Sequence, residues 1–203
     1  MAINLANNNS LANITALPSS VSGGAMTLLA TQTASGSANI SFTSGIDDTY
    51  DSYVFKFYNI HPATDNTQFA FQGDTGTNTN YNQTITSTTF RAFNREPDDD
   101  AGLGYVTGED QAQSTAFQKL TAGGTVGADA DQNACGELQI FNPSSTTFVK
   151  NFIGRSSGNH ASDYATDFYV AGYFNLTTAL TRFQFKMLSG NIDSGVIKLY
   201  GIS

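Results

Sequence analysis

Hydrophobic and polar residues alternate along most of the chain, in short segments that turn residues separate. In the segment 52–60, Tyr53, Phe55 and Phe57 fall on one side of an extended chain and polar residues interrupt the other side. Because successive side chains of a β-strand point to opposite faces, this pattern predicts a strand with Phe55 and Phe57 in the core. Comparable patterns predict nine further strands, over 27–33, 38–43, 67–72, 86–93, 137–141, 147–153, 168–174, 182–188 and 196–202.

The short spacing of these segments predicts one all-β domain over residues 26–203, an antiparallel β-sandwich of jelly-roll type. Turn residues at 35–37 and 189–191 predict tight connections between the strands on either side of them. The alternation over 196–202 predicts that this last segment belongs to a sheet. The segment 111–120 has apolar residues at helical spacing, and it is compatible with a short helix or an irregular loop.

Residues 1–25 have a different composition, with few large apolar side chains. One interpretation is a disordered leader, and the other is an extended N-terminal arm that becomes ordered on a partner subunit. The segment has neither the basic residues nor the unbroken apolar core of a signal peptide. If the segment is a docking arm, its small apolar residues are the expected contacts: Ile3, Leu5, Leu11, Ile14 and Leu17.

The charge of the chain restricts its partners. Charged residues make up 13% of the sequence, and the formal net charge is −8. Nucleic acids and anionic lipids bind to clustered Lys and Arg, whereas the nine basic residues here are scattered. We therefore expect no nucleic-acid partner, and the lack of a long apolar run predicts no membrane insertion. Cys135 is the only cysteine, which excludes an intrachain disulfide and favours a buried, inert thiol.

Motifs for catalysis are missing from the sequence. His61 and His160 are the only histidines, and neither stands at a spacing typical of a metal site or a nucleophilic triad. The chain has no nucleophile elbow and no phosphate-binding glycine loop, so we expect no enzyme activity, no cofactor and no metal. A polysaccharide-cleaving enzyme that uses carboxylates such as Glu96 or Glu137 remains the least favoured alternative.

The turn-rich loops 73–82, 94–110 and 121–133 are predicted to be exposed, and binding residues often lie on such loops. The acidic run in the second loop could supply oxygen ligands to Ca²⁺, although a solvated acidic loop is favoured. Tyr81, Tyr105 and Tyr164 are candidates for stacking on a sugar ring. The candidate loop-binding residues are Asp74, Tyr81, Asp98, Asp99, Asp100 and Tyr105.

Four parts of the sequence carry a family resemblance. The longest is DDTYDSYVFKFYNIHP at 47–62, and the others are 11–19, 136–144 and 190–202. Together they resemble virion structural proteins of tailed phages that infect marine bacteria, particularly cyanobacteria. The segments cover much of the chain, but they are typical of a fold and not of a chemical site.

The resemblance implies a non-enzymatic particle component that is made in the host cytoplasm and located in the virion. Its expected partners are the major capsid protein or neck and tail proteins, together with further copies of itself, a trimer being one option. The chain has no long stalk repeat, which favours capsid decoration or an appendage adaptor, docked through residues 1–25. The alternative is a carbohydrate- or receptor-binding module of a tail or neck fibre, whose ligand is a host-surface glycan.

Overall fold

The computed structural model describes residues 26–121 and 126–203, and these two ranges form strands and connecting loops without an α-helix. None of the described segments is a helix long and apolar enough to cross a membrane. The strands are β1 Thr27–Ser37, β2 Ile40–Phe42, β3 Ser52–Pro62, β4 Phe69–Thr75, β5 Ile85–Arg95, β6 Ala101–Tyr105, β7 Gln118–Lys119, β8 Ala134–Phe141, β9 Lys150–Asn159, β10 Tyr164–Phe174, β11 Leu180–Met187 and β12 Ile192–Ile202. The all-β prediction is confirmed, and the segment 111–120 is a loop that ends in the short strand β7.

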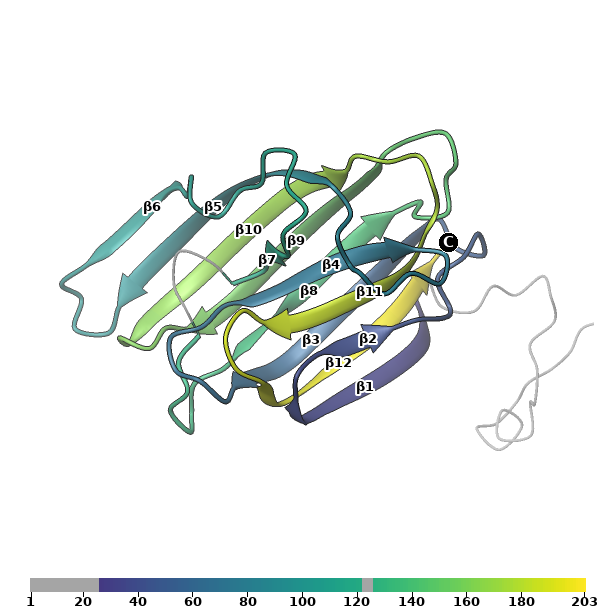
Figure 1. The fold of residues 1–203 in the computed structure, drawn as a ribbon. Coiled ribbons are helices and arrows are strands. Elements are labelled where there is room, and N and C mark those ends of the chain that lie inside the picture. Colours follow the sequence, from purple (N-terminus) through teal and green to yellow (C-terminus); the bar gives the residue numbers. More distant parts are fainter. Residues whose placement is uncertain (1–25, 122–125) are drawn as a thin grey trace, which may run out of the picture.

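The strands form two antiparallel sheets that pack face to face. The long sheet has eight strands in the order β1-β12-β3-β8-β9-β10-β5-β6, and the short sheet has four in the order β2-β11-β4-β7. The short sheet lies in front of β12, β3 and β8, whereas β6, β5 and part of β10 extend beyond it to the left (Figure 1). The long sheet is therefore covered on its inner face over only part of its width.

The chain passes repeatedly from one sheet to the other. Consecutive strands pair as hairpins only at β5–β6, β8–β9 and β9–β10 within the described ranges. The tight connection predicted at 189–191 is confirmed, because it joins β11 to β12, although these two strands lie in different sheets. The connection predicted at 35–37 is wrong, because residues 35–37 belong to β1. Alternation identifies a strand but carries no information about its partner, and β1 in fact pairs with β12, with Thr33 opposite Val196.

Phenylalanine rings from both sheets fill the space between them. Phe55 and Phe57 are fully buried, which confirms the prediction made for the segment 52–60. Phe185 of the short sheet lies 5.0 Å from Phe55 and 5.8 Å from Phe69 between ring centroids. Such offset and edge-to-face contacts add to the stabilisation that burial of the rings provides. The fully or nearly fully buried phenylalanines are Phe42, Phe55, Phe57, Phe69, Phe71, Phe152, Phe168, Phe174, Phe183 and Phe185.

Candidate functional site

Two of the predicted loop-binding residues are buried. Asp74 is 0% exposed and Tyr81 is 5% exposed, so the expectation of an exposed loop does not hold for them. The Asp74 carboxylate accepts hydrogen bonds of 2.8 Å from the backbone N–H groups of Thr75 and Tyr81 and from the side chain of Gln83. Asp74 therefore fixes the conformation of the loop after β4. The docking residues proposed at positions 3, 5, 11, 14 and 17 lie outside the described residues, and their role stays a prediction.

The acidic run connects β5 to β6, and two of its carboxylates, those of Asp99 and Asp100, have partners in that hairpin or beside it. Asp99 forms an ion pair of 3.2 Å with Arg95, and Asp100 accepts a hydrogen bond of 2.9 Å from the Tyr164 hydroxyl. Asp98 is exposed, with a positive φ of 57° in the turn. Across the described ranges, no three His, Cys, Asp or Glu side chains are grouped to hold a metal ion. The exposed residue Tyr105 donates a hydrogen bond to Asp110 in the loop that follows β6.

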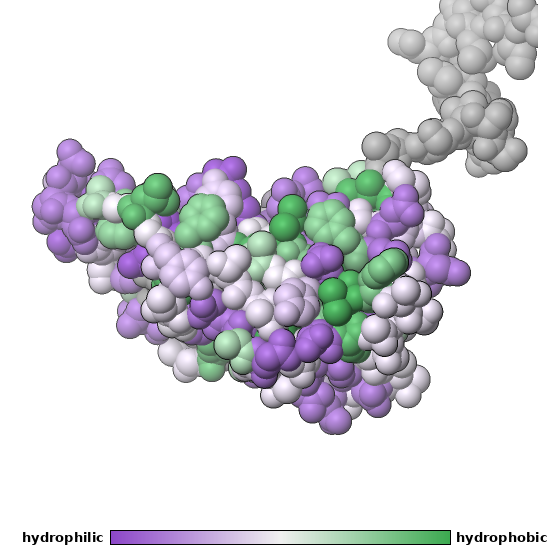
Figure 2. Space-filling model, turned by 90° about the horizontal axis from the view of Figure 1, so that it is seen from above, coloured by the Kyte–Doolittle hydropathy of each residue, from purple (hydrophilic) through white to green (hydrophobic). Residues whose placement is uncertain are grey.

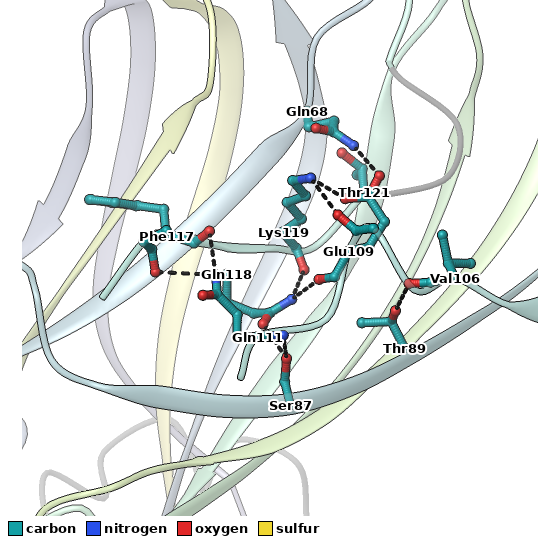
Figure 3. A network of polar contacts seen from close by, with 12 residues as sticks. Gln68, Ser87, Thr89, Val106, Glu109, Gln111, Phe117, Gln118, Lys119 and Thr121 are labelled. Atoms are coloured by element: carbon teal, nitrogen blue, oxygen red, sulfur yellow. Dashed lines mark hydrogen bonds and ion pairs between the residues drawn. The ribbon is translucent and has the colours of Figure 1, made fainter. Parts of the chain in front are cut away.

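A buried polar network closes the inner face of β5 near its beginning. The Ser87 hydroxyl donates to Gln118 at 2.6 Å, and the Thr89 hydroxyl donates to the carbonyl oxygen of Val106 at 2.9 Å (Figure 3). Lys119 and Glu109 form an ion pair beside them. The loop 106–121 therefore covers Ser87 and Thr89, but not the later inward-facing positions of the same strand.

A polar cavity begins where this cover ends. Its volume is about 400 Å³, and its lining comes from β5, β10 and the two hairpin loops next to them. Arg95 pairs with Tyr164 and Phe93 pairs with Thr166 across the two strands, which places these side chains on one face. The lining residues are Arg91, Phe93, Arg95, Asp100, His160, Ser162, Tyr164 and Thr166.

The cavity has cationic and aromatic walls. The Arg91 guanidinium lies over the Phe93 ring, 4.6 Å from its centroid, and the Arg95 guanidinium lies 5.6 Å from the Tyr164 centroid. Nδ1 of His160 accepts a hydrogen bond of 2.8 Å from the Ser162 N–H, so the neutral ring carries its proton on Nε2. Burial, and then the positive charge of Arg91, lower the pKa of His160 below its usual 6.5. The neutral form of His160 is therefore favoured at pH 7.

The sequence pattern identified this cavity only in part. Asp100 and Tyr164 were among the predicted binding residues, whereas the two arginines were missed. Arg91 belongs to the predicted strand 86–93, and Arg95 belongs to the predicted loop 94–110, of which only acidic and tyrosine residues were named as candidates. One signal was present: the inward-facing positions of β5 change from Ile85 and Thr89 to Arg91 and Arg95. A change from apolar or small residues to charged residues on one face of a strand indicates where the opposite layer stops.

A buried lysine begins strand β9, at the opposite end of this strand from the polar cavity. Lys150 is 0% exposed, and its amine donates to the carbonyl oxygens of Phe148 at 3.0 Å and Leu176 at 3.2 Å. No carboxylate forms an ion pair with it among the described residues. Burial lowers the pKa of Lys150 below its usual 10.5, because the charged form is poorly solvated there.

This lowered pKa predicts a dependence of stability on pH. Between the pKa of Lys150 in the folded state and 10.5, the unfolded chain binds more protons than the folded one. The wild type is therefore expected to gain stability relative to Lys150→Met as the pH rises to about 10.5. The quantity that changes is the difference between their free energies of unfolding. Urea unfolding at several pH values between 7 and 10.5 measures the difference. Lys198→Met, on the outer face, is the control, and an equal pH dependence in the wild type and Lys150→Met contradicts the prediction.

The outer face of the long sheet carries exposed apolar side chains. Tyr58, Phe90 and Ile153 are 41%, 43% and 49% exposed, and they come from β3, β5 and β9. Phe90 stacks on Tyr169 with ring centroids 4.6 Å apart, and the Arg155 guanidinium lies 4.8 Å from the same tyrosine ring. The surface seen from above likewise has separate apolar groups between hydrophilic ones (Figure 2). Further exposed apolar side chains on the long sheet are Leu28, Leu103, Tyr105 and Phe141.

Comparison of the chain with protein-family models, with curated proteins and with solved structures finds no match. Any functional assignment therefore depends on the residues and on the fold that they form.

Proposed function

We propose that the chain is a non-enzymatic structural protein of a bacteriophage particle, built as a jelly roll and assembled with further copies of itself. The observation that carries the proposal is the strand order. The set β1-β12-β3-β8 lies in one sheet and the set β2-β11-β4-β7 in the other. This distribution of the strands supports an eight-stranded jelly roll, an architecture used by viral capsid proteins and lectins.

The remaining four strands enlarge one sheet of the proposed jelly roll. The β5–β6 pair enters the chain between β4 and β7, and the β9–β10 pair enters between β8 and β11. Both pairs join the long sheet beside β8, in the order β9-β10-β5-β6. Because fold alone does not imply function, the particle assignment rests also on the family resemblance of segments such as 47–62.

The outer face of the long sheet is proposed as the contact between copies. Exposed apolar side chains there are suited to burial against a partner. The charges beside them largely cancel, because Lys56 pairs with Glu137 at 3.5 Å and Arg155 pairs with Asp167 at 2.7 Å. A second copy of a chain with a net charge of −8 therefore meets little repulsion at this face.

Electron cryo-microscopy of particles purified from the cells that produce this chain tests the assignment. We expect density for the sandwich at the capsid surface or at the neck or tail, with the outer face of β3, β8, β9 and β10 covered by a second copy. Mass spectrometry of the same particles supplies an independent count of the chain. Its absence from the particles contradicts the structural role, and a single isolated copy with this face exposed to solvent contradicts the contact between copies.

A carbohydrate-binding role is the second candidate, and the cavity at the end of β5 and β10 favours it. Aromatic rings beside hydroxyl, carboxylate and guanidinium groups are the chemistry that sugar-binding proteins use. Phe93 and Tyr164 supply the rings, with centroids 5.8 Å apart and planes at 64°. The two roles are compatible, because a particle protein can also bind a surface glycan.

A further inference from the structure

We propose that the cavity binds one acidic sugar unit, with Arg91 holding its carboxylate or sulfate group. The inference rests on the carbohydrate-binding candidate and not on the particle assignment. It starts from Arg91. Of the four arginines in the sequence, this one makes no hydrogen bond or ion pair with any residue in 26–121 or 126–203.

The other three arginines have polar partners. Arg95 pairs with Asp99 and Arg155 with Asp167, while Arg182 donates to the carbonyl oxygens of Thr77 and Asn78. Arg91 is half-buried, and its guanidinium lies over the Phe93 ring at the lining of the cavity. A partly desolvated cation with open hydrogen-bond donors favours an anion that it can bind through two parallel hydrogen bonds.

The rest of the lining is suited to a sugar ring. Asp100 offers carboxylate oxygens to sugar hydroxyls, and the protonated Nε2 of neutral His160 offers a donor. Nε of Arg95 is buried and has no hydrogen-bond partner among the described residues, so it is a further donor beside the cavity. The faces of Phe93 and Tyr164 suit the apolar C–H groups of the ring. A volume of about 400 Å³ is at the small end of ligand cavities, as one monosaccharide unit requires.

The charges around the cavity disfavour a ligand with more than one negative charge, because Asp99 and Asp100 together offset the charges of Arg91 and Arg95. Arg91 forms no ion pair with the residues of 26–121 or 126–203, but Asp99 neutralises Arg95 and Asp100 adds a negative charge beside Tyr164. Asp98 and Asp163 lie on the same two hairpin loops. A phosphate dianion is therefore disfavoured, whereas a uronate or a sulfate ester carries one charge and fits one free guanidinium.

The cavity is separate from the proposed jelly roll, because its lining residues come from the two added strand pairs and their loops. Binding can therefore be lost while the eight strands that form the main sandwich stay intact. The separation also distinguishes the two proposals: failure of sugar binding leaves the particle assignment untouched, and absence from particles leaves the cavity untouched.

To test the inference, the full chain is titrated with four probes, and ¹H–¹⁵N NMR spectra monitor each titration. The probes are methyl β-glucuronide, glucose 6-sulfate, methyl β-glucoside and inorganic sulfate. We expect at least one acidic sugar to shift the amide signals of residues 91–95 and 160–166, and to bind about tenfold or more tightly than the neutral glucoside or inorganic sulfate. Binding of the glucuronide alone identifies a carboxylate, and binding of the sulfated glucose alone identifies a sulfate ester.

Variants of Arg91 test whether this residue binds the acidic sugar. Arg91→Gln is expected to weaken the acidic sugar about ten- to a hundredfold, and Arg91→Lys to restore part of the loss. Arg155→Gln is the matched control, because Arg155 also lies over an aromatic ring but on the outer face. Thermal unfolding of each variant verifies its fold. The inference is overturned if no acidic sugar binds, if neutral glucoside or inorganic sulfate binds equally well, or if folded Arg91→Gln binds like the wild type.

Discussion

Replacing Phe185 by alanine is expected to lower the free energy of unfolding by about 3–5 kcal/mol. The ring is fully buried on β11 and contacts the rings of Phe42, Phe55, Phe69 and Phe71. Its removal leaves a cavity between the two sheets that surrounding rings cannot fill without moving off their present contacts. Urea unfolding followed by tyrosine fluorescence measures the loss.

Phe148→Ala is the matched control for this experiment. Phe148 is 70% exposed in the loop before β9, so the same change of side chain there is expected to alter stability by less than about 0.5 kcal/mol. Equal losses in the two variants contradict the description of Phe185 as a central residue of the core.

Replacing Gly136 by alanine is expected to cost about 1–3 kcal/mol, although the change adds only a methyl group. A Cβ atom at this position in β8 lies 2.7 Å from the Phe57 ring and 2.8 Å from the Cα atom of Ser156, and it also meets the carbonyl oxygen of Arg155. Backbone atoms of β9 cannot yield as a flexible side chain does. The same urea titration measures the effect.

Gly104→Ala is the control, because a Cβ atom there has no other atom within 4 Å. Gly104 is also in a strand of the long sheet, and neither glycine has a positive φ. We expect a neutral effect or a gain of a few tenths of a kcal/mol, since alanine restricts the unfolded chain. A loss in Gly104→Ala as large as in Gly136→Ala would mean that crowding is not the cause.

Local patterns predicted most of the strands, because alternation reports directly which faces of a strand are apolar. Ala101–Tyr105 was expected to be a loop and forms β6, since two glycines and an exposed leucine give no alternation. The strand predicted over 52–60 extends two residues further, because His61 and Pro62 end β3. Strand partners were beyond prediction because they depend on contacts distant in sequence, such as β1 with β12.

The candidate site was harder to predict for the same reason. Asp100 and Tyr164 are 64 residues apart in the sequence, and only the pairing of β10 with β5 brings them into contact. Arg91 and Phe93 gave no signal as loop residues, because they lie within a strand. The loop-based expectation also led to Asp74, whose polarity serves hydrogen bonds within the fold and not a surface.

The position of β12 between β1 and β3 has a consequence for synthesis of the protein. During translation the first strands leave the ribosome long before Ile192–Ile202 is made, so β1 and β3 lack their shared neighbour until then. Such pairing between distant segments slows folding, and the open strand edges can meanwhile pair with other nascent chains. Completion of the long sheet therefore waits for the synthesis of β12, and rapid production of the chain favours aggregation before that step.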